Sequence, residues 1–245
     1  MIILTPNNFD KKRDFLIYKV GSTNVVFSTA EEDRSFNRHT EYGVENLNSI
    51  KEDFKLKDVI YLNQVHSDKV YIYNKDYKNI KEEEGDGIIT SEKDIAIGVF
   101  TADCVPIIIV NEKSKAIATI HSGWKGTFNS IVLKTLIKMK EEFKIDIKET
   151  KIFIGPHIKQ CCYEVSNELK QNFLDKTGID EEKLFNGRNL SLKECIVKDL
   201  KDLGIMDNNI YLLDLCTYCE NDIELYSYRK SEGTYGRLFS FAFIE

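Results

Sequence analysis

The sequence predicts a single α/β (α+β) domain with mixed β-sheets, and three observations lead to this class. Predicted strands outnumber predicted helices roughly two to one. Strands and helices follow one another in a mixed order, whereas a doubly wound parallel sheet needs strict alternation. The 245 residues contain no internal repeat and no linker rich in Pro, Gly or Ser, so one domain over residues 1–245 is expected.

The individual elements follow from local patterns. Short runs of β-branched and aromatic residues between polar turns predict strands at 15–20, 24–28, 59–62, 69–73, 95–100, 106–110, 116–120, 151–155, 210–214, 225–228 and 238–243. Apolar residues that recur every three to four positions predict helices over 44–54, 128–143, 165–173 and 192–203. Two polar segments, 78–87 and 177–188, are expected to be surface loops.

The composition argues against several classes of protein. The 34 Lys and Arg residues against 40 Asp and Glu give a net charge of −6 without a basic block, which disfavours a nucleic-acid partner. The most apolar window, residues 95–110, contains Asp103 and Pro106, so no membrane-spanning segment is expected. The N-terminal residues lack the pattern of a signal peptide, and six cysteines are too few for a disulfide scaffold. We therefore expect a cytoplasmic protein with reduced cysteines.

Three residues with metal-binding side chains follow the ends of predicted strands. His66 ends the sequence NQVH, Cys104 ends TADC, and His121 opens HSGWKG. Loops at strand ends project side chains into a shared crevice, and two imidazoles with one thiolate suit Zn²⁺ while a fourth position stays open. Alternatively, Cys104 is a small buried hydrophobe and the histidines only form hydrogen bonds. The separations of 38 and 17 residues match no local metal motif, so spacing alone leaves both interpretations open.

Three charged residues are candidates for binding anions or protons. Lys125 lies in HSGWKG, where two glycines allow close backbone approach and the following helix offers free N–H groups to an anion. The alternative is a sharp turn with Trp124 packed in the core. Arg229, in SYRK before the glycine-rich segment 233–237, suits an anion or a sugar hydroxyl, unless the segment is a solvated turn. Asp86, in EGDG, is either a carboxylate partner or a turn residue.

The other cysteines form two pairs and a single residue. Cys161 and Cys162 are adjacent, and Cys216 and Cys219 form a CxxC pair, which is a frequent half of a zinc site. A structural zinc bound by all four is one interpretation. Against it, adjacent cysteines on an extended segment point to opposite sides of the chain. Cys195 lies in an apolar helical row and is expected in the core.

Together, these motifs resemble a known family. NQVH, TADCVP, HSGWKG, IGP followed by CCYEV, CTYC, and SYR followed by GR occur in this order. The ordered set closely resembles the bacterial laccase-domain family of YfiH-like proteins, from about residue 59 to the C-terminus. Its members were once labelled polyphenol oxidases and are now regarded as purine nucleoside phosphorylases with adenosine deaminase activity. The resemblance implies a sandwich of mixed sheets flanked by helices.

The resemblance also implies a metal and a set of reactions. The family's metal-binding positions fall on His66, Cys104 and His121, and the metal that it implies is zinc. The implied reactions are phosphorolysis of adenosine, inosine, guanosine and methylthioadenosine, and hydrolytic deamination of adenosine. Purine nucleosides and phosphate are thus the expected partners, and the protein is expected to be a monomer or a small homo-oligomer.

Further residues receive roles in the expected mechanism. We expect Asp86 to carry protons and expect Lys125 and Arg229 to stabilise the charge of phosphate. The residues expected to contact the substrate are Asn63, Gln64, Gly123 and Arg229.

Three other functions compete with this hypothesis. Two histidines and a cysteine also form blue-copper sites, but a multicopper oxidase needs many more than the four histidines of this chain, so copper is disfavoured. A metal-free hydrolase would use Cys104 as nucleophile and His121 or His66 as base. Editing of peptidoglycan precursors, a role proposed for relatives, would make nucleoside turnover incidental.

Overall fold

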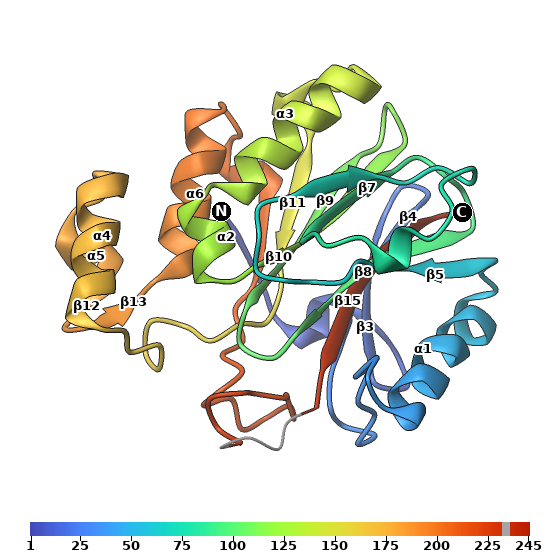
Figure 1. Ribbon diagram of the computed structural model, residues 1–245, viewed down its shortest axis with the longest axis horizontal. Coiled ribbons are helices and arrows are strands. Elements are labelled where there is room, and N and C mark those ends of the chain that lie inside the picture. Colours follow the sequence, from blue (N-terminus) through green and yellow to red (C-terminus); the bar gives the residue numbers. More distant parts are fainter. Residues whose placement is uncertain (232–235) are drawn as a thin grey trace.

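Two β-sheets stack face to face at the centre of the molecule (Figure 1). The computed structural model describes residues 1–231 and 236–245. Within these residues, one sheet has seven strands in the order β1 (Ile2–Leu4), β14 (Ile210–Leu213), β11 (Lys151–Ile154), β9 (Val105–Asn111), β10 (Ala116–Ser122), β7 (Gly87–Thr90) and β6 (Val70–Ile72). The other has six, in the order β2 (Asp10–Lys12), β3 (Phe15–Val20), β4 (Thr23–Ser28), β15 (Leu238–Ile244), β8 (Ile95–Thr101) and β5 (Asp58–Ile60).

Helices cover the outer faces of both sheets (Figure 1). The seven-stranded sheet carries α2 (Trp124–Phe128), α3 (Ile131–Phe143) and α6 (Leu192–Asp202), and the six-stranded sheet carries α1 (Glu41–Phe54). Beyond α6 lie α4 (Asn167–Thr177), α5 (Glu181–Leu184) and the hairpin of β12 (Phe185–Asn186) and β13 (Asn189–Leu190). Short 3₁₀ turns occur at Pro6–Asn8, Ile80–Glu82, Ile147–Glu149 and Asp207–Asn209. The predicted single α/β (α+β) domain is confirmed, as is the sandwich that the family resemblance implied.

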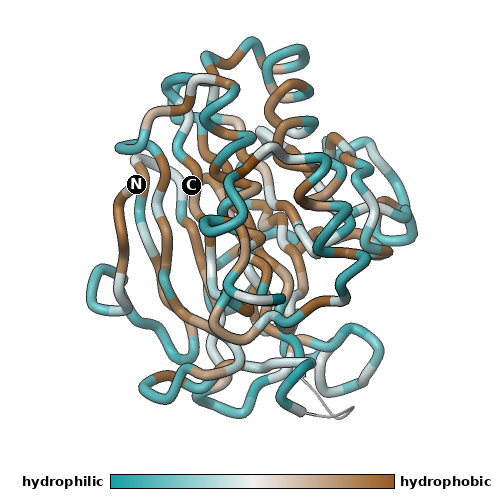
Figure 2. Tube along the Cα trace, turned by 90° about the vertical axis from the view of Figure 1, so that its left-hand side faces the viewer, coloured by the Kyte–Doolittle hydropathy of each residue, from teal (hydrophilic) through white to brown (hydrophobic). Residues whose placement is uncertain are grey.

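The central strands are apolar on both faces, which explains their unbroken hydrophobic runs. In β9, Ile107 and Ile109 pack under the helices, whereas Ile108 and Val110 face the six-stranded sheet. Side chains alternate between the faces of a strand, so a strand covered on both sides needs apolar residues at every position. The hydropathy of the chain follows this arrangement, with apolar residues concentrated in the interior strands (Figure 2).

Both sheets are mixed, and one connection between them positions the site. Strand β9 is antiparallel to β10 and β11, whereas β6–β7 and β11–β14 are parallel pairs. Strand β8 lies in the six-stranded sheet and β9 in the seven-stranded sheet. The three residues between them, 102–104, therefore cross from one sheet to the other at an edge of the sandwich.

Several predicted elements differ from those observed. The helix predicted over 128–143 is two helices, because Ser130 has a φ of 55° and interrupts the hydrogen-bond ladder. Phe128 then packs on Phe173 of α4, at 5.1 Å between ring centroids. Residues 225–228 form no strand, although their alternation resembles one, and β7 was not predicted. Segment 78–87 was expected to be a surface loop, but Asp86 near its end is fully buried.

A buried ion pair joins the start of β3 to the loop before α1. The guanidinium of Arg34 contacts the Asp14 carboxylate at 2.8 Å and lies over the rings of Phe15 and Phe36. Burial raises the pKa of Asp14, Arg34 opposes this effect, and the pKa reaches about 6. The Asp14 and Arg34 side chains are 0% and 3% exposed, so the charge of Asp14 depends on Arg34 for compensation, whereas Arg34 also lies 3.7 Å from the Asp53 carboxylate.

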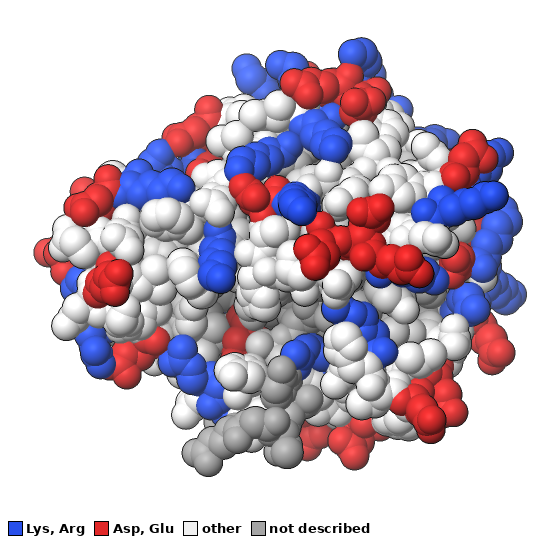
Figure 3. Space-filling model, viewed as in Figure 1, with Lys and Arg blue, Asp and Glu red and all other residues white. Residues whose placement is uncertain are grey.

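The molecular surface carries charges of both signs. On the face in Figure 3, Lys and Arg side chains lie interspersed with Asp and Glu. Among residues 1–231 and 236–245, no helix combines the length and apolar character needed to cross a membrane.

Candidate metal centre

His66, Cys104 and His121 meet at one edge of the sandwich. His66 lies in the loop after β5, Cys104 directly precedes β9, and His121 lies near the end of β10. Antiparallel pairing of Ser122 with Val105 brings the end of β10 beside Cys104. The metal-binding atoms of the three side chains all lie within 4.8 Å of one another. The loops at three strand ends thus bring together residues separated by up to 55 positions in the sequence.

The spacing of these three side chains fits a tetrahedral metal. The Sγ of Cys104 lies 3.8 Å from Nε2 of His66, and the two imidazole rings are 4.7 Å apart at an interplanar angle of 84°. Tetrahedral coordination at ordinary zinc–sulfur and zinc–nitrogen distances separates sulfur from nitrogen by about 3.6 Å. Three protein ligands leave one position for water or substrate, as in catalytic rather than structural zinc sites.

The Cys104 turn is held by an aspartate in an unusual conformation. Asp103 has a φ of 94°, in the left-handed half of conformational space. Its carboxylate accepts hydrogen bonds from the Thr217 hydroxyl and the Arg229 backbone N–H, both at 2.7 Å. Its carbonyl accepts the backbone N–H of Ile158 at 2.9 Å. Three distant segments therefore fix the turn that presents Cys104.

Asp86 holds both histidines of the site. Its carboxylate lies 2.7 Å from Nδ1 of His121, which leaves Nε2 of His121 to face the centre. It also accepts the backbone N–H of His66 at 3.1 Å and the backbone N–H and hydroxyl of Ser67 at 2.5 and 2.7 Å. Burial raises the pKa of Asp86, but the hydrogen bonds from His121 and Ser67 outweigh this effect and lower it. A carboxylate behind a ligating histidine is the usual outer partner of a zinc site.

The centre favours a thiolate. Burial raises the pKa of the Cys104 thiol, but the charges and hydrogen bonds of His121 and His66 outweigh burial and lower it to about 6. Burial lowers the pKa of His121, whereas Cys104 and Asp86 raise it to about 9. The thiolate is the form of cysteine that ligates metals and attacks electrophiles.

Gly123 packs directly against the ligands. A Cβ atom at this position would lie 2.9 Å from Cδ2 of His66 and 3.0 Å from Sγ of Cys104. Both distances are shorter than the 3.5–4.0 Å of an ordinary contact. The closeness of the His66 and Cys104 side chains thus requires glycine here.

Asn63 and Gln64, the two polar residues expected at the substrate, form hydrogen bonds within the protein. The Gln64 side chain forms two hydrogen bonds with the backbone of Phe100, at 2.7 and 2.9 Å. The Asn63 side chain accepts a hydrogen bond from Arg38 at 2.6 Å. Arg38, which the sequence analysis missed, is half-buried over the ring of Phe100, 5.4 Å from its centroid. Arg38, Gln64 and His66 line a cavity of about 120 Å³.

A larger cavity lies on the Trp124 side of the centre. It has a volume of about 380 Å³, and its lining includes Trp124, Tyr163, Arg188 and Arg229. The guanidinium of Arg229 lies over the Tyr163 ring, 5.4 Å from its centroid, and donates to the carbonyl of Glu164 at 3.1 Å. Burial and the nearby Cys104 raise the pKa of Tyr163 to about 12, so its hydroxyl stays protonated. Tyr163 follows the CC pair and could have been found through that motif.

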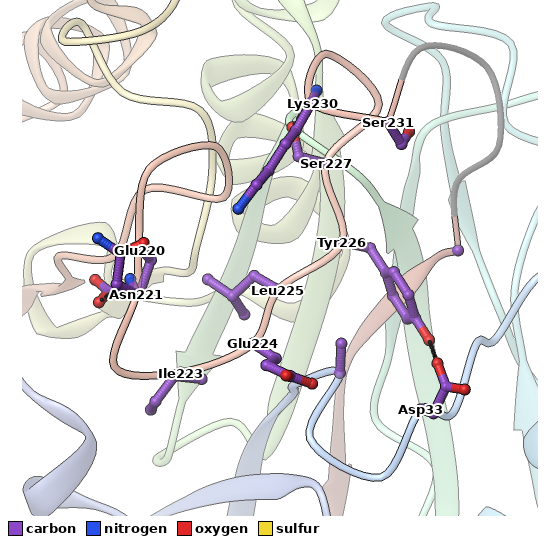
Figure 4. Close-up of a pocket in the computed structure, with 12 residues that line it drawn as sticks. Asp33, Glu220, Asn221, Ile223, Glu224, Leu225, Tyr226, Ser227, Lys230 and Ser231 are labelled. Carbon is purple, nitrogen blue, oxygen red and sulfur yellow. Dashed lines mark hydrogen bonds between the residues drawn. The ribbon is translucent and has the colours of Figure 1, made fainter.

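The other predicted residues lie at varying distances from this arrangement. Lys125 is exposed, with its ammonium 5.6 Å from the centroid of the Trp124 ring. Part of the segment 233–237 predicted beside Arg229 lies outside the described residues. A cavity of about 450 Å³ is lined by residues 220–231 and the loop before α1, where the Tyr226 hydroxyl donates to Asp33 at 3.4 Å (Figure 4). Its described lining includes none of the three ligands.

The four cysteines in two pairs also converge. The Sγ atoms of Cys161, Cys162, Cys216 and Cys219 lie within 4.8 Å of one another, and we refer to these residues as the four-cysteine group. The expectation that adjacent cysteines point apart is wrong here. The backbone N–H groups of Cys162 and Tyr163 both bond to the carbonyl of Lys159, so the segment is a turn rather than an extended strand. Cys195 is buried in α6, as predicted.

The sequence of this chain is similar to those of a known protein family and of several named bacterial proteins. The family described as "Multi-copper polyphenol oxidoreductase laccase" matches residues 20–245. A protein of Clostridium acetobutylicum named purine nucleoside phosphorylase is 41% identical over 230 residues, 94% of this chain and 95% of the relative. A Borreliella burgdorferi protein of the same name is 38% identical over 191 residues, 76% of this chain and 79% of the relative.

Solved structures share the fold at lower identity. The hypothetical protein YfiH of Bacillus licheniformis superimposes with a TM-score of 0.88 at 21% identity, over 98% of this chain and 100% of that one. YlmD of Geobacillus stearothermophilus gives a TM-score of 0.87 at 22% identity, over 97% and 99% of the two chains. The match over residues 20–245 and the 41% identical relative place this chain in the laccase-domain family of YfiH-like proteins.

Proposed function

We propose that the chain is a zinc-dependent purine nucleoside phosphorylase that also deaminates adenosine. The proposal extends to all of residues 1–245 as one catalytic domain, with adenosine, inosine, guanosine and methylthioadenosine as substrates. The names of the relatives support the phosphorylase activity. The observation that carries the proposal is the group of His66, Cys104 and His121 backed by Asp86, because it offers a metal an open fourth position.

Both reactions have a simple chemical balance. In phosphorolysis, an oxygen of phosphate bonds to C1′ of the ribose while the bond from C1′ to N9 breaks, and the purine leaves with the electron pair and takes up a proton. In deamination, water adds to C6 of adenine and ammonia leaves. A zinc ion in the site would supply Lewis acidity, which lowers the pKa of water toward neutrality and polarises oxygen atoms. We propose zinc rather than copper because the chain has only four histidines, of which two are in this group.

The cavity beside Trp124 is our proposed nucleoside and phosphate site; its described lining includes none of His66, Cys104 and His121, but Cys104 lies close enough to Tyr163 to raise the pKa of the tyrosine. Tyr163 and Trp124 offer aromatic surface to a purine, and Arg229 offers a planar fork of donors to phosphate. Lys125 does not line this cavity, but its exposed ammonium lies over the Trp124 ring and adds positive charge nearby. An oriented guanidinium stabilises the negative charge that phosphate brings to the reacting centre.

Other residues are assigned positioning roles. We propose that Asp86 orients His121 and the His66 loop rather than carrying protons. Its carboxylate is buried behind the two histidines, and the hydrogen bonds that it accepts lower its pKa. Asn63 and Gln64 shape the wall of the site through Arg38 and Phe100 instead of binding substrate directly.

One observation favours a second candidate function. The Cys104 thiol lies 3.8 Å from an imidazole and has a lowered pKa, which is also the arrangement of a metal-free cysteine hydrolase. Chelation separates the two candidates, because complete removal of metal abolishes the zinc-dependent reaction and leaves a thiol nucleophile active.

Product analysis tests the proposed reactions. The protein is incubated with adenosine in the presence and absence of phosphate, and inosine, adenine and hypoxanthine are followed by chromatography. Free base that forms only with phosphate supports phosphorolysis, and inosine that forms in its absence supports deamination. If neither product forms with zinc-loaded protein, the proposal is wrong.

A further inference from the structure

The four-cysteine group has the geometry of a metal site. Cys161 and Cys162 come from the turn after β11, and Cys216 and Cys219 come from the segment after β14. The Sγ of Cys161 lies 3.7 Å from those of Cys216 and Cys219 and 3.6 Å from that of Cys162. Four thiols from two separate segments therefore surround one point.

These separations match one particular kind of centre. Four sulfurs at about 2.3 Å from a tetrahedral zinc ion lie about 3.8 Å from one another. A disulfide would instead require about 2.05 Å between two of the atoms. Iron–sulfur clusters hold their cysteine sulfurs farther apart, because iron and sulfide atoms lie between them. A single soft cation is the occupant that fits the observed spacing.

The backbone around Cys216 supplies the hydrogen bonds that a thiolate ligand needs. The backbone N–H of Lys159 points to its Sγ at 3.5 Å, and the N–H groups of Tyr218 and Cys219 also bond to this sulfur. Cys216 is buried, so three donors on one sulfur compensate for lost hydration. A tetrathiolate zinc centre has a net charge of −2, and Lys159 lies within electrostatic reach of Cys161 and Cys216.

The four-cysteine group also joins two segments that hold the turn of residues 102–104, which presents Cys104. His157 and Cys216 form an isolated parallel bridge, and the backbone N–H of Thr217 bonds to the carbonyl of His157 at 3.1 Å. Thr217 and Ile158, which flank the group on its two segments, both bind Asp103, the neighbour of Cys104. A metal that joins these segments would stabilise the turn from outside the catalytic centre.

We propose that Cys161, Cys162, Cys216 and Cys219 bind a second, structural zinc ion, distinct from the His66–Cys104–His121 centre. All four coordination positions are then filled by protein, so this ion carries no substrate. The proposal is independent of nucleoside chemistry and holds even if the proposed function fails.

Metal content in variants tests the second site. The protein is expressed with added zinc, purified under anaerobic reducing conditions, and analysed by mass spectrometry of its metals. We expect Cys104→Ser to keep about one zinc ion per chain and Cys104→Ser combined with Cys219→Ser to keep none. Cys195→Ser is the matched control, because it removes a buried thiol outside both groups and leaves the zinc content unchanged.

Cobalt absorption and alkylation provide readouts that leave all four cysteines of the group unchanged. Co²⁺ added to metal-free Cys104→Ser should give the intense sulfur-to-metal absorption of a tetrathiolate centre. In the zinc-loaded protein, the exposed Cys161 and Cys219 should resist alkylation until a strong chelator is added. Zinc-free Cys104→Ser under these conditions, prompt alkylation of both residues, or a disulfide within the group would each overturn the proposal.

Discussion

Replacing Gly123 with alanine tests the geometry of the catalytic centre. The added methyl group would lie 2.9 Å from the His66 ring and 3.0 Å from the Cys104 sulfur. Relief to an ordinary contact requires a shift of about 0.6 Å or more, whereas metal–ligand distances tolerate about 0.2 Å. The His66 and Cys104 side chains must turn away from the added methyl group, so the substitution opposes the arrangement that a shared metal would need. We expect zinc affinity to fall roughly 10- to 100-fold, with a stability change of about 1 kcal/mol or less in metal-free protein.

Chelator competition and unfolding in the presence of chelator measure these two quantities. Gly126→Ala, in the helix that Gly123 caps, is the matched control: its Cβ would lie 3.3 Å from the Ser67 carbonyl and 3.4 Å from the Ile131 side chain, a milder overlap that reaches neither the His66 nor the Cys104 side chain. We expect the control to keep its zinc affinity within about threefold. Unchanged zinc affinity in Gly123→Ala would refute the placement of His66 and Cys104 on one metal.

Three further changes test other parts of the account. Asp86→Asn should lower zinc affinity about 10- to 100-fold in chelator competition, because the uncharged amide presents a donor to the N–H groups around it. Arg34→Met should destabilise the fold by about 3–5 kcal/mol at alkaline pH in urea unfolding, because Asp14 is then buried and charged without its partner. The loss should shrink as the pH falls toward about 6, since removal of Arg34 raises the pKa of folded Asp14 further, and the folded variant then binds a proton that neither the wild-type fold nor the unfolded chain binds. Arg229→Ala should raise the KM for phosphate roughly 10- to 100-fold in initial-rate assays.

Each of these predictions has a control or a contradicting result. Asp68→Asn removes a surface carboxylate paired with Lys134 and should leave zinc binding intact. Equal losses from both aspartate variants would contradict the positioning role of Asp86. A pH-independent penalty in Arg34→Met would contradict the buried charge on Asp14. A change in the KM for nucleoside alone in Arg229→Ala would place phosphate elsewhere.

The strands of the central sheets could be predicted because most buried positions in them carry an apolar residue in the sequence. All seven residues of β8, of β9 and of β10 are buried, and most of them are apolar, as expected of strands that are covered on both faces. The break at Ser130 could not be predicted, because the apolar period continues through it. Residues 225–228 were predicted as a strand but form none. Their alternating sequence resembles that of an edge strand, although no neighbouring strand within the described residues pairs with them.

The three ligands could be proposed from residue type and position after a strand, but their convergence could not. It depends on the crossing of residues 102–104 between two sheets and on the pairing of β10 with β9, neither of which leaves a local signal. The motif of Asp86 indicated a polar residue in a turn, and only the fold places it behind His121. The convergence of the four-cysteine group could not be predicted, because it depends on a turn after Lys159 that brings the adjacent cysteines to one side of the chain.

Phosphate-dependent release of hypoxanthine from inosine tests the central claim most directly. The rate is measured for zinc-loaded protein, for protein stripped by a strong chelator and then resupplied with zinc, and for Cys104→Ser. The account predicts release that requires both phosphate and metal, returns on resupply, and is lost in Cys104→Ser. Absence of release from the zinc-loaded protein, or full release from the stripped protein or from Cys104→Ser, would contradict it.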